Sequence, residues 1–261
     1  MLEFATRLAE RAGEVLMEHF RPLGRAEVVA QKGQVRNWVT AADTASEELI
    51  VAAIRERFPG HSINAEESGE HAGDGRHVWY VDPLDGTVNF THGFPFFAVS
   101  IGFVVDGVPV LGAVRAPALR ETFAGKVGVG AELNGTPIGV SGTEVLIEAL
   151  LATGFSYVRN EHPDHNVDNF ADLVMRSRDI RRAGAAAIDL CYVAAGRFDG
   201  FWEVHLSPWD VAAGSAIIRA AGGTVSDFRG GEEFIAGRNI VATNGKIHEL
   251  LRTGLQPLRA L

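Results

Sequence analysis

Residues 79–90 read WYVDPLDGTVNF, and this segment carries the most informative chemical pattern in the chain. An apolar stretch leads to Asp82, and the proline that follows fixes the backbone and removes one hydrogen-bond donor. Asp85 comes next in the pattern, and Gly86 allows a sharp turn before Thr87 begins a short helix. Two carboxylates on one rigid turn repel each other unless a cation lies between them. The segment therefore predicts a site for a divalent cation.

The same turn offers other groups that bind ions. The carbonyl oxygen of Leu84 lies between the two carboxylates in the sequence, and Mg²⁺ prefers such hard oxygen ligands. The backbone amides of Gly86 and Thr87 stand at a predicted helix start, where N–H groups and the helix dipole favour an anion such as phosphate. One loop would then supply both metal ligands and a phosphate site. The alternative is an ordinary turn in which Asp85 or Thr87 caps the helix.

Acidic residues also stand at the ends of other predicted elements. They are Asp43 at the start of a helix over 43–58, Glu66 and Glu67 after a strand over 62–65, and Asp210 at the start of a helix over 210–221. Taken singly, adjacent glutamates are typical of a solvated surface, and an aspartate at a helix start is typical of a cap. Sites in α/β folds are built from such element ends. Their coincidence in one chain favours a shared acidic site.

Hydrophobic periodicity predicts an α+β first half and an alternating α/β second half. The predicted helices cover 2–20, 43–58, 166–176, 186–195, 210–221 and 246–251. The predicted strands cover 62–65, 77–81, 97–105, 108–115, 149–153, 200–204 and 240–243. The pairs Asp106-Gly107 and Asn134-Gly135 mark tight turns, the first of them within a hairpin. The expected domains are residues 1–140, which carry most of the candidate metal ligands, and residues 141–261, which carry Asp210 and the substrate contacts.

Composition places the chain among ordinary globular proteins. It has 261 residues, 46% of them hydrophobic and 22% charged, and a formal net charge of −9 at pH 7. An acidic chain attracts neither nucleic acid nor an anionic membrane by bulk charge, so a bound phosphate would need positive charge gathered locally, such as a metal ion. The single cysteine, Cys191, cannot form an internal disulfide and is expected to be buried. No apolar run approaches the ~20 residues that span a bilayer and no leader is visible, so we expect a cytoplasmic protein.

Together these residues resemble the inositol monophosphatase family of metal-dependent phosphatases. The most specific motifs are DPLDGT at 82–87, followed by Asn89, Phe90 and His92, and WDVAAG at 209–214, followed by AGG at 221–223. The segments VTAAD at 39–43, EE at 66–67 and DGFWE at 199–203 are also similar. The resemblance covers nearly the whole chain, and it implies a layered αβαβα fold of the sugar-phosphatase type and a homodimer.

The resemblance implies a site for two or three magnesium ions. Glu66, Asp82 and the Leu84 carbonyl would hold one ion, and Asp82, Asp85 and Asp210 would hold a second. A third ion would bind more loosely near Glu66. With metal ions supplying charge, water can attack phosphorus directly and no covalent nucleophile is needed. In keeping with this, the chain has neither a Gly-x-Ser-x-Gly elbow nor a Walker-type lysine loop.

The resemblance also implies catalytic roles. Thr87, hydrogen-bonded to Asp43, would orient the attacking water and help to deprotonate it beside the metal ligand Glu66. The amides of Gly86 and Thr87 would bind phosphate oxygens.

Substrate hydroxyls, on the same resemblance, would meet Asp85, Glu203 and the backbone of Ala186. Supporting residues near the metals or the water would be Lys32, Glu67 and Asn89. The chain departs from the family at Asn37, where an aspartate is common. An amide is neutral and can donate as well as accept, so we expect tuned rather than lost activity. For His92, a hydrogen bond that holds the loop is favoured over metal ligation.

The expected activity is Mg²⁺-dependent hydrolysis of a small phosphate monoester, first of all inositol monophosphate. Histidinol phosphate, fructose 1,6-bisphosphate and adenosine 3′,5′-bisphosphate are alternatives within the family. Glu203 would repel a second phosphate, which weighs against the two bisphosphates. An alternative of another class is a regulatory role through RNA or protein contacts, although the net charge argues against direct RNA binding.

Overall fold

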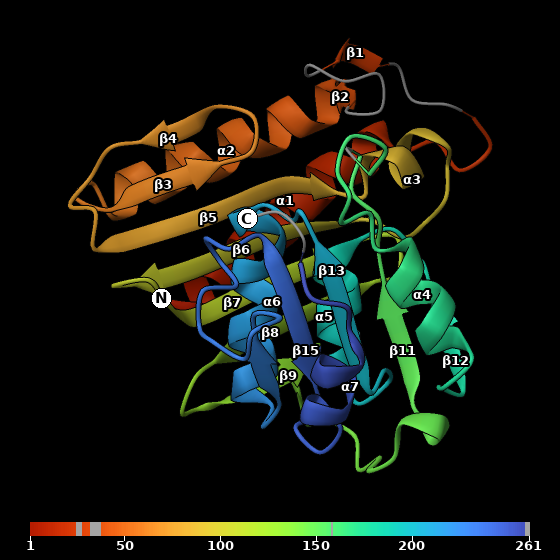
Figure 1. Cartoon of the computed structure of the whole chain (residues 1–261). Coiled ribbons are helices and arrows are strands. Elements are labelled where there is room, and N and C mark those ends of the chain that lie inside the picture. Colours follow the sequence, from red (N-terminus) through yellow and green to blue (C-terminus); the bar gives the residue numbers. More distant parts are fainter. Residues whose placement is uncertain (25–27, 32–37, 158, 259–261) are drawn as a thin grey trace.

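The computed structural model describes residues 1–24, 28–31, 38–157 and 159–258. In this part of the chain, helices and sheets alternate in five layers (Figure 1). Two helices cover one face of a large sheet, two helices separate it from a smaller sheet, and two more cover the outer face of the smaller sheet. The predicted αβαβα architecture is confirmed.

The first helical layer consists of α1 (Leu2–His19) and α2 (Ala41–Arg57). Leu8 and Leu16 lie on the buried face of α1, as its apolar periodicity predicts. Helix α2 begins slightly earlier than predicted because Thr40, rather than an aspartate, is its N-cap. The Thr40 hydroxyl accepts a hydrogen bond from the Ala42 N–H at 3.2 Å.

Within the described residues the large sheet has eight strands in the order β10-β9-β8-β7-β6-β5-β3-β4. Its strands are β3 (Ser62–Ala65), β4 (Gly69–His71), β5 (His77–Asp85), β6 (Ala98–Val105), β7 (Val108–Ala116), β8 (Glu121–Lys126), β9 (Gly130–Leu133) and β10 (Thr136–Ile138). A short helix, α3 (Thr87–Thr91), follows β5, and β1 (Val28–Gln31) pairs separately with β2 (Trp38–Thr40). The predicted hairpin turn at Asp106-Gly107 is confirmed, with φ positive at both residues.

The smaller sheet has five strands in the described residues, in the order β12-β11-β13-β15-β14. They are β11 (Leu150–Thr153), β12 (Asp179–Arg181), β13 (Gly200–Val204), β14 (Thr224–Ser226) and β15 (Asn239–Thr243). Leu173 of α4 (Val167–Val174) and Leu251 of α7 (His248–Gly254) pack with Trp202 over its outer face. A single 3₁₀ turn, Leu146–Glu148, precedes β11.

Helices α5 (Ala186–Ala194) and α6 (Pro208–Ala220) form the central layer and contact both sheets. Gly102 on β6 and Gly112 on β7 let the backbone of α6 lie directly on the strands. A Cβ atom on Gly102 would be 2.6 Å from the Ala213 nitrogen, a separation that no side chain tolerates. This close approach brings the start of α6 to the end of β5.

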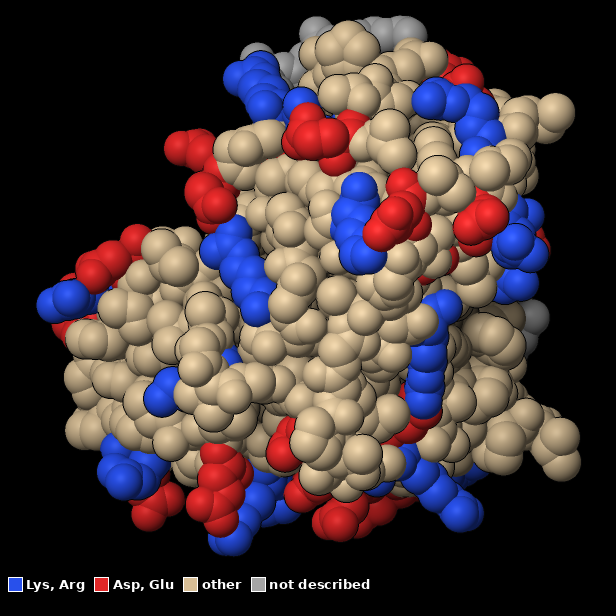
Figure 2. All heavy atoms as spheres, turned by 90° about the horizontal axis from the view of Figure 1, so that it is seen from below, with Lys and Arg blue, Asp and Glu red and all other residues tan. Residues whose placement is uncertain are grey.

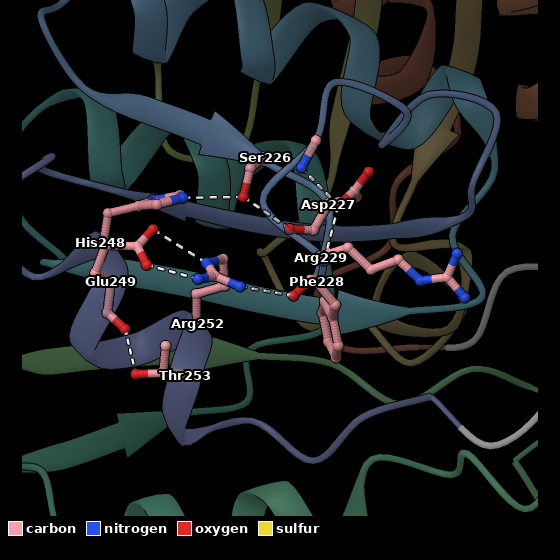
Figure 3. Close-up of polar contacts among 9 residues, drawn as sticks. Ser226, Asp227, Phe228, Arg229, His248, Glu249, Arg252 and Thr253 are labelled. Atoms are coloured by element: carbon pink, nitrogen blue, oxygen red, sulfur yellow. Dashed lines mark hydrogen bonds and ion pairs between the residues drawn. The ribbon is translucent and has the colours of Figure 1, made fainter.

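A polar network holds the loop between β14 and β15 against α7 (Figure 3). The Asp227 carboxylate accepts a hydrogen bond from the Arg229 N–H at 2.8 Å, and the Ser226 hydroxyl lies 2.9 Å from His248 Nε2. The loop runs on to Arg238, which has a left-handed backbone with φ of 57°. The network therefore fixes the segment that carries Arg238 to the site described below.

Eight strands of the described residues lie outside the predicted set: β1, β2, β4, β8, β9, β10, β12 and β14. Five of them span only three residues, and their pairing depends on neighbouring strands rather than on a local pattern. No helix in the described ranges combines the length and the apolar character needed to cross a membrane.

Candidate active site

The predicted acidic turn lies at the carboxyl end of β5. In a regular strand, Asp82 and Asp85 would point to opposite faces because side chains alternate. The pairing with β6 contains a bulge between them, so that Asp82 lies opposite Ser100 and Asp85 opposite Ala98. A bulge inserts an extra residue and reverses the alternation, which brings both carboxylates to one side. Strand β5 consequently extends to Asp85 rather than ending at residue 81 as predicted.

Gly86 is required at the next position. Its backbone is left-handed, with φ of 89°, and a Cβ atom there would lie 2.9 Å from the Phe96 carbonyl oxygen. Only glycine adopts this conformation without strain. The turn into α3 therefore depends on the glycine that the sequence pattern singled out.

The first turns of α2 present three buried polar residues to the loops that carry the acids. The Ser46 hydroxyl donates to the Pro83 carbonyl oxygen at 3.0 Å, next to Asp82. The Glu47 carboxylate accepts hydrogen bonds from the backbone N–H groups of Glu67 and Ser68, each at 2.7 Å. Helix α2 thus ties the Glu66 turn and the Asp82 turn to one rigid element.

Asp43 is the third buried polar residue of this helix. Its Oδ2 accepts hydrogen bonds from the Thr40 N–H at 2.8 Å and the Thr40 hydroxyl at 2.6 Å. Its Oδ1 is buried and has no hydrogen-bond partner among the described residues. Burial, reinforced by the charge of Glu67, raises the pKa of Asp43 to about 6.

The predicted hydrogen bond between Thr87 and Asp43 is wrong for this structure. The Thr87 hydroxyl donates instead to the Leu84 carbonyl oxygen at 3.1 Å. The physical reason is local: Asp43 completes the capping box of α2 with Thr40, while Thr87 turns back onto its own bulged strand.

Asp210 is brought to the acidic turn by the central layer. It lies in the first turn of α6, where its Oδ2 accepts a hydrogen bond from the Ser207 N–H at 2.7 Å. The Ser100 hydroxyl, opposite Asp82 in the β-ladder, donates to the Trp209 carbonyl oxygen at 3.3 Å. These contacts place the two aspartates together.

Four carboxyl groups gather at this point. Asp82 and Asp210 lie close enough that the charge of Asp210 raises the pKa of Asp82. Burial raises the pKa of Asp82 well above its usual value, and Glu66, Asp85 and Asp210 raise it further. Burial, reinforced by Asp210, raises the pKa of Asp85 to about 8. The cluster repels its own ionised form.

A hard divalent cation fits this donor set, because it would replace the protons that the cluster must otherwise keep. As the side chains stand, no group of three or more His, Cys, Asp or Glu residues in the described chain is arranged to hold a metal ion. Binding would therefore replace protons held by the cluster with a shared ion. The chemistry of the residues, rather than a preformed cage, supports a metal site.

A cavity of about 430 Å³ opens beside these acids. Six predicted site residues line it: Glu66, Asp85, Gly86, Ala186, Glu203 and Asp210. Three more predicted site residues are buried and do not line it: Asp43, Asp82 and Leu84. At the cavity, the start of α5 faces the acidic turn, since the Ala187 N–H donates to Asp85 Oδ2 at 2.7 Å.

Glu203 stands on β13 with its carboxylate over the α-carbon of Gly154. A methyl group on residue 154 would overlap this carboxylate. Burial raises the pKa of Glu203 to about 8, opposed by the positive charge of Arg182. Glu203 therefore has the position, and the access to the cavity, that the sequence analysis predicts for a substrate contact.

The cavity residues that lie outside the sequence prediction include Tyr157, Arg182, Asp189 and Arg238. Arg238 is held by the 205–206 segment, where its Nε donates to the Leu206 carbonyl oxygen at 3.3 Å. Its charge lowers the pKa of Asp210, against the larger effect of burial. The arginines change the charge balance of the pocket, so repulsion by Glu203 alone no longer weighs against a second phosphate.

The supporting residues divide into two groups. Asn89 Nδ2 donates to the carbonyl oxygens of Phe96 at 2.7 Å and Ala183 at 2.9 Å, which joins the acidic turn to the segment before α5. His92 Nδ1 lies 2.8 Å from the Val88 carbonyl oxygen, in keeping with a loop-holding role. Lys32 and Asn37 lie outside the described residues.

Comparison with known proteins agrees with this geometry. The family model described as "Inositol monophosphatase family" matches residues 1–259. The chain is 45% identical to "Nus factor SuhB" of Pseudomonas aeruginosa over 98% of this chain and 96% of that protein. It is 43% identical to "Inositol-1-monophosphatase" of Synechocystis sp. over 97% of this chain and 88% of that protein. The solved structure of an inositol monophosphatase from Anabaena (Nostoc) sp. matches with a TM-score of 0.89 and 43% identity, covering 100% of this chain and 96% of that one.

Proposed function

Because the chain belongs to the inositol monophosphatase family, we propose that it is a magnesium-dependent phosphatase that hydrolyses a small phosphate monoester, first of all inositol monophosphate. The observation that carries this proposal is the cluster of Glu66, Asp85 and Asp210 at the cavity with the buried Asp82 beside them. Four neighbouring carboxyl groups that repel one another are costly to ionise unless a cation joins them. A family relative named inositol-1-monophosphatase supports the choice of first substrate.

Magnesium ions at this cluster would neutralise charge on the phosphoryl group and activate the attacking water. The chain's own residues position the reaction. Gly86 brings its backbone to the cavity, where its amide can bind a phosphate oxygen. Glu66 and Asp85 line the cavity and can accept protons or hydrogen bonds from water. The Thr87 hydroxyl donates to the Leu84 carbonyl oxygen and not to Asp43. We therefore assign the role of orienting the water to Glu66 in preference to Thr87.

A substrate screen tests the proposal. Inositol 1-phosphate, histidinol phosphate, fructose 1,6-bisphosphate and adenosine 3′,5′-bisphosphate are each incubated with the purified chain, with Mg²⁺ and with EDTA. We expect phosphate release only with Mg²⁺ and fastest from inositol 1-phosphate. Equal or faster phosphate release from histidinol phosphate would make histidinol phosphate, and not inositol 1-phosphate, the preferred substrate. Phosphate release in the presence of EDTA would show that hydrolysis does not need a metal ion.

A second function is suggested by the relative named Nus factor SuhB. We propose as the second candidate that this chain also acts as a Nus factor, through contacts that do not use hydrolysis. On the face shown in Figure 2, acidic and basic side chains are interspersed, and the net charge of −9 opposes direct RNA binding. Replacing the Pseudomonas gene with this chain, or with its Asp82→Asn variant, separates the two functions. Rescue by both supports the second candidate, and rescue by neither argues against it.

The homodimer stays a prediction, which light scattering on the purified chain decides. A cytoplasmic location is likewise part of the proposal, supported by the single cysteine, Cys191, which is buried in α5.

A further inference from the structure

Arg182 and Asp189 line the cavity beside Glu203 but have no part in the hydrolysis proposed above. They differ from the acidic cluster because they include a positive charge. Arg182 and Asp189 are therefore expected to affect which leaving group the cavity accepts, and not how it binds metal ions.

Arg182 is exposed at the cavity and available to a ligand. It follows β12, and a Cβ atom on Gly184 would lie 2.6 Å from its Nη1, so the guanidinium lies across the backbone of Gly184. Asn89 fixes that backbone through the Ala183 carbonyl oxygen. The Arg182 guanidinium donates no hydrogen bond to any described residue, whereas its neighbour Arg181 pairs with Asp179 at 2.6 Å. Its N–H groups can therefore donate hydrogen bonds to a bound ligand.

Asp189 supplies an acceptor without a donor. It lies in the first turn of α5 with 1% of its surface exposed, and its Oδ1 has no hydrogen-bond partner within the described ranges. A buried carboxylate oxygen without a partner is costly, and a bound group that donates a hydrogen bond would remove that cost. Asp189 therefore points to a ligand with a donor.

The three side chains act on one another. The charge of Arg182 lowers the pKa of both Glu203 and Asp189, against the larger opposing effect of burial. Arg182 is thus near both carboxyl groups, although neither forms an ion pair with it. A ligand between them would meet acceptors and donors together.

We propose that Arg182 and Asp189 extend the hydroxyl contact expected of Glu203 into a subsite for the leaving group, and that Arg182 selects uncharged polyol phosphates over amino-alcohol phosphates. A hydroxyl group can donate to a carboxylate and accept from a guanidinium at once. An ammonium group only donates and is repelled by Arg182. This inference rests on the proposed phosphatase function.

Steady-state kinetics of four proteins test the subsite: the wild type, Arg182→Gln, Asp189→Asn and the control Arg181→Gln. The substrates are inositol 1-phosphate, histidinol phosphate and p-nitrophenyl phosphate, which has no aliphatic hydroxyl group. We expect Arg182→Gln to raise the KM for inositol 1-phosphate about tenfold more than that for p-nitrophenyl phosphate. The preference for inositol 1-phosphate over histidinol phosphate should fall by about the same factor. Asp189→Asn should act in the same direction on the polyol, and Arg181→Gln should match the wild type.

Equal changes for all three substrates, or no change in Arg182→Gln, would overturn the subsite. Calorimetric Mg²⁺ titration of Arg182→Gln gives a second readout, and a tenfold loss of metal affinity would place the effect at the metal site instead. Arg182 is exposed, so Arg182→Gln should fold even if Asp189→Asn, at a buried position, does not. The test can then be decided from Arg182→Gln alone. A wild type that hydrolyses none of the substrates overturns the proposed function as well. Normal hydrolysis with uniform variant effects overturns the subsite alone.

Discussion

The carboxylate of Glu203 on β13 lies directly over the α-carbon of Gly154 at the end of β11, and no side chain fits between them. We expect Gly154→Ala to displace this carboxylate from the cavity wall. Overpacking of this kind costs about 1–3 kcal/mol of stability. The KM for inositol 1-phosphate should rise about tenfold, measured beside the melting temperature. Gly142→Ala is the matched control, because nothing lies within 4 Å of a Cβ atom there.

Glu47 should control metal affinity without touching the metal. In Glu47→Gln, one oxygen that accepts a backbone N–H from Glu67 or Ser68 becomes an NH₂ donor and faces another donor. The turn that carries Glu66 should shift, so we expect Mg²⁺ affinity to fall about tenfold by calorimetry. Glu48→Gln changes the exposed neighbour on the same helix and should bind Mg²⁺ as the wild type does. Equal affinity in both variants would contradict the positioning role.

Asp82→Asn should separate folding from function. The amide removes one charge from a buried, self-repelling cluster, so the metal-free variant should melt at a higher temperature than the metal-free wild type. Phosphate release should be lost, because the proposed bridging ligand is neutral. Added Mg²⁺ should stabilise the wild type more than the variant. A variant that keeps full turnover would disprove the assigned metal ligands.

Stability in EDTA should depend on pH with an unusual sign. Asp and Glu side chains in an unfolded chain titrate near pH 4, whereas the folded pKa is about 8 for Asp85 and for Glu203. Between these values the unfolded chain releases protons that the folded chain retains. The free energy of unfolding should therefore fall as pH rises from about 4 to 8.

Thermal melts at pH 6 and pH 8.5, with EDTA and with Mg²⁺, measure this dependence. Mg²⁺ binds the ionised acids, so the stabilisation it gives should be larger at pH 8.5. A stability that rises with pH in EDTA would show that the acids are not held as described.

Much of the fold follows from local pattern. Helix α1, strand β3 and the Asp106-Gly107 hairpin match their predictions closely, because each has its own periodicity or turn residues. The acidic positions were predictable for a similar reason: each stands at the end of a recognisable element. The gathering of Glu66, Asp85 and Asp210 then follows from the layered fold.

The remaining features depend on contacts that local pattern does not encode. The bulge between Asp82 and Asp85 exists only in the register with β6. Arg182 and Arg238 reach the cavity through loops whose course is set by distant partners, such as Asn89 for the segment after Arg182. The hydroxyl of Thr87 donates to the Leu84 carbonyl oxygen of the same bulged strand, a contact that depends on the bulge and not on a local pattern.

The order in which the layers occur along the chain has a consequence during protein synthesis. Helix α6 lies on β6 and β7, yet residues 208–220 leave the ribosome long after those strands. Until then the inner face of the large sheet lacks its cover, and a nascent chain paused before α6 exposes an apolar surface open to chaperones and to aggregation.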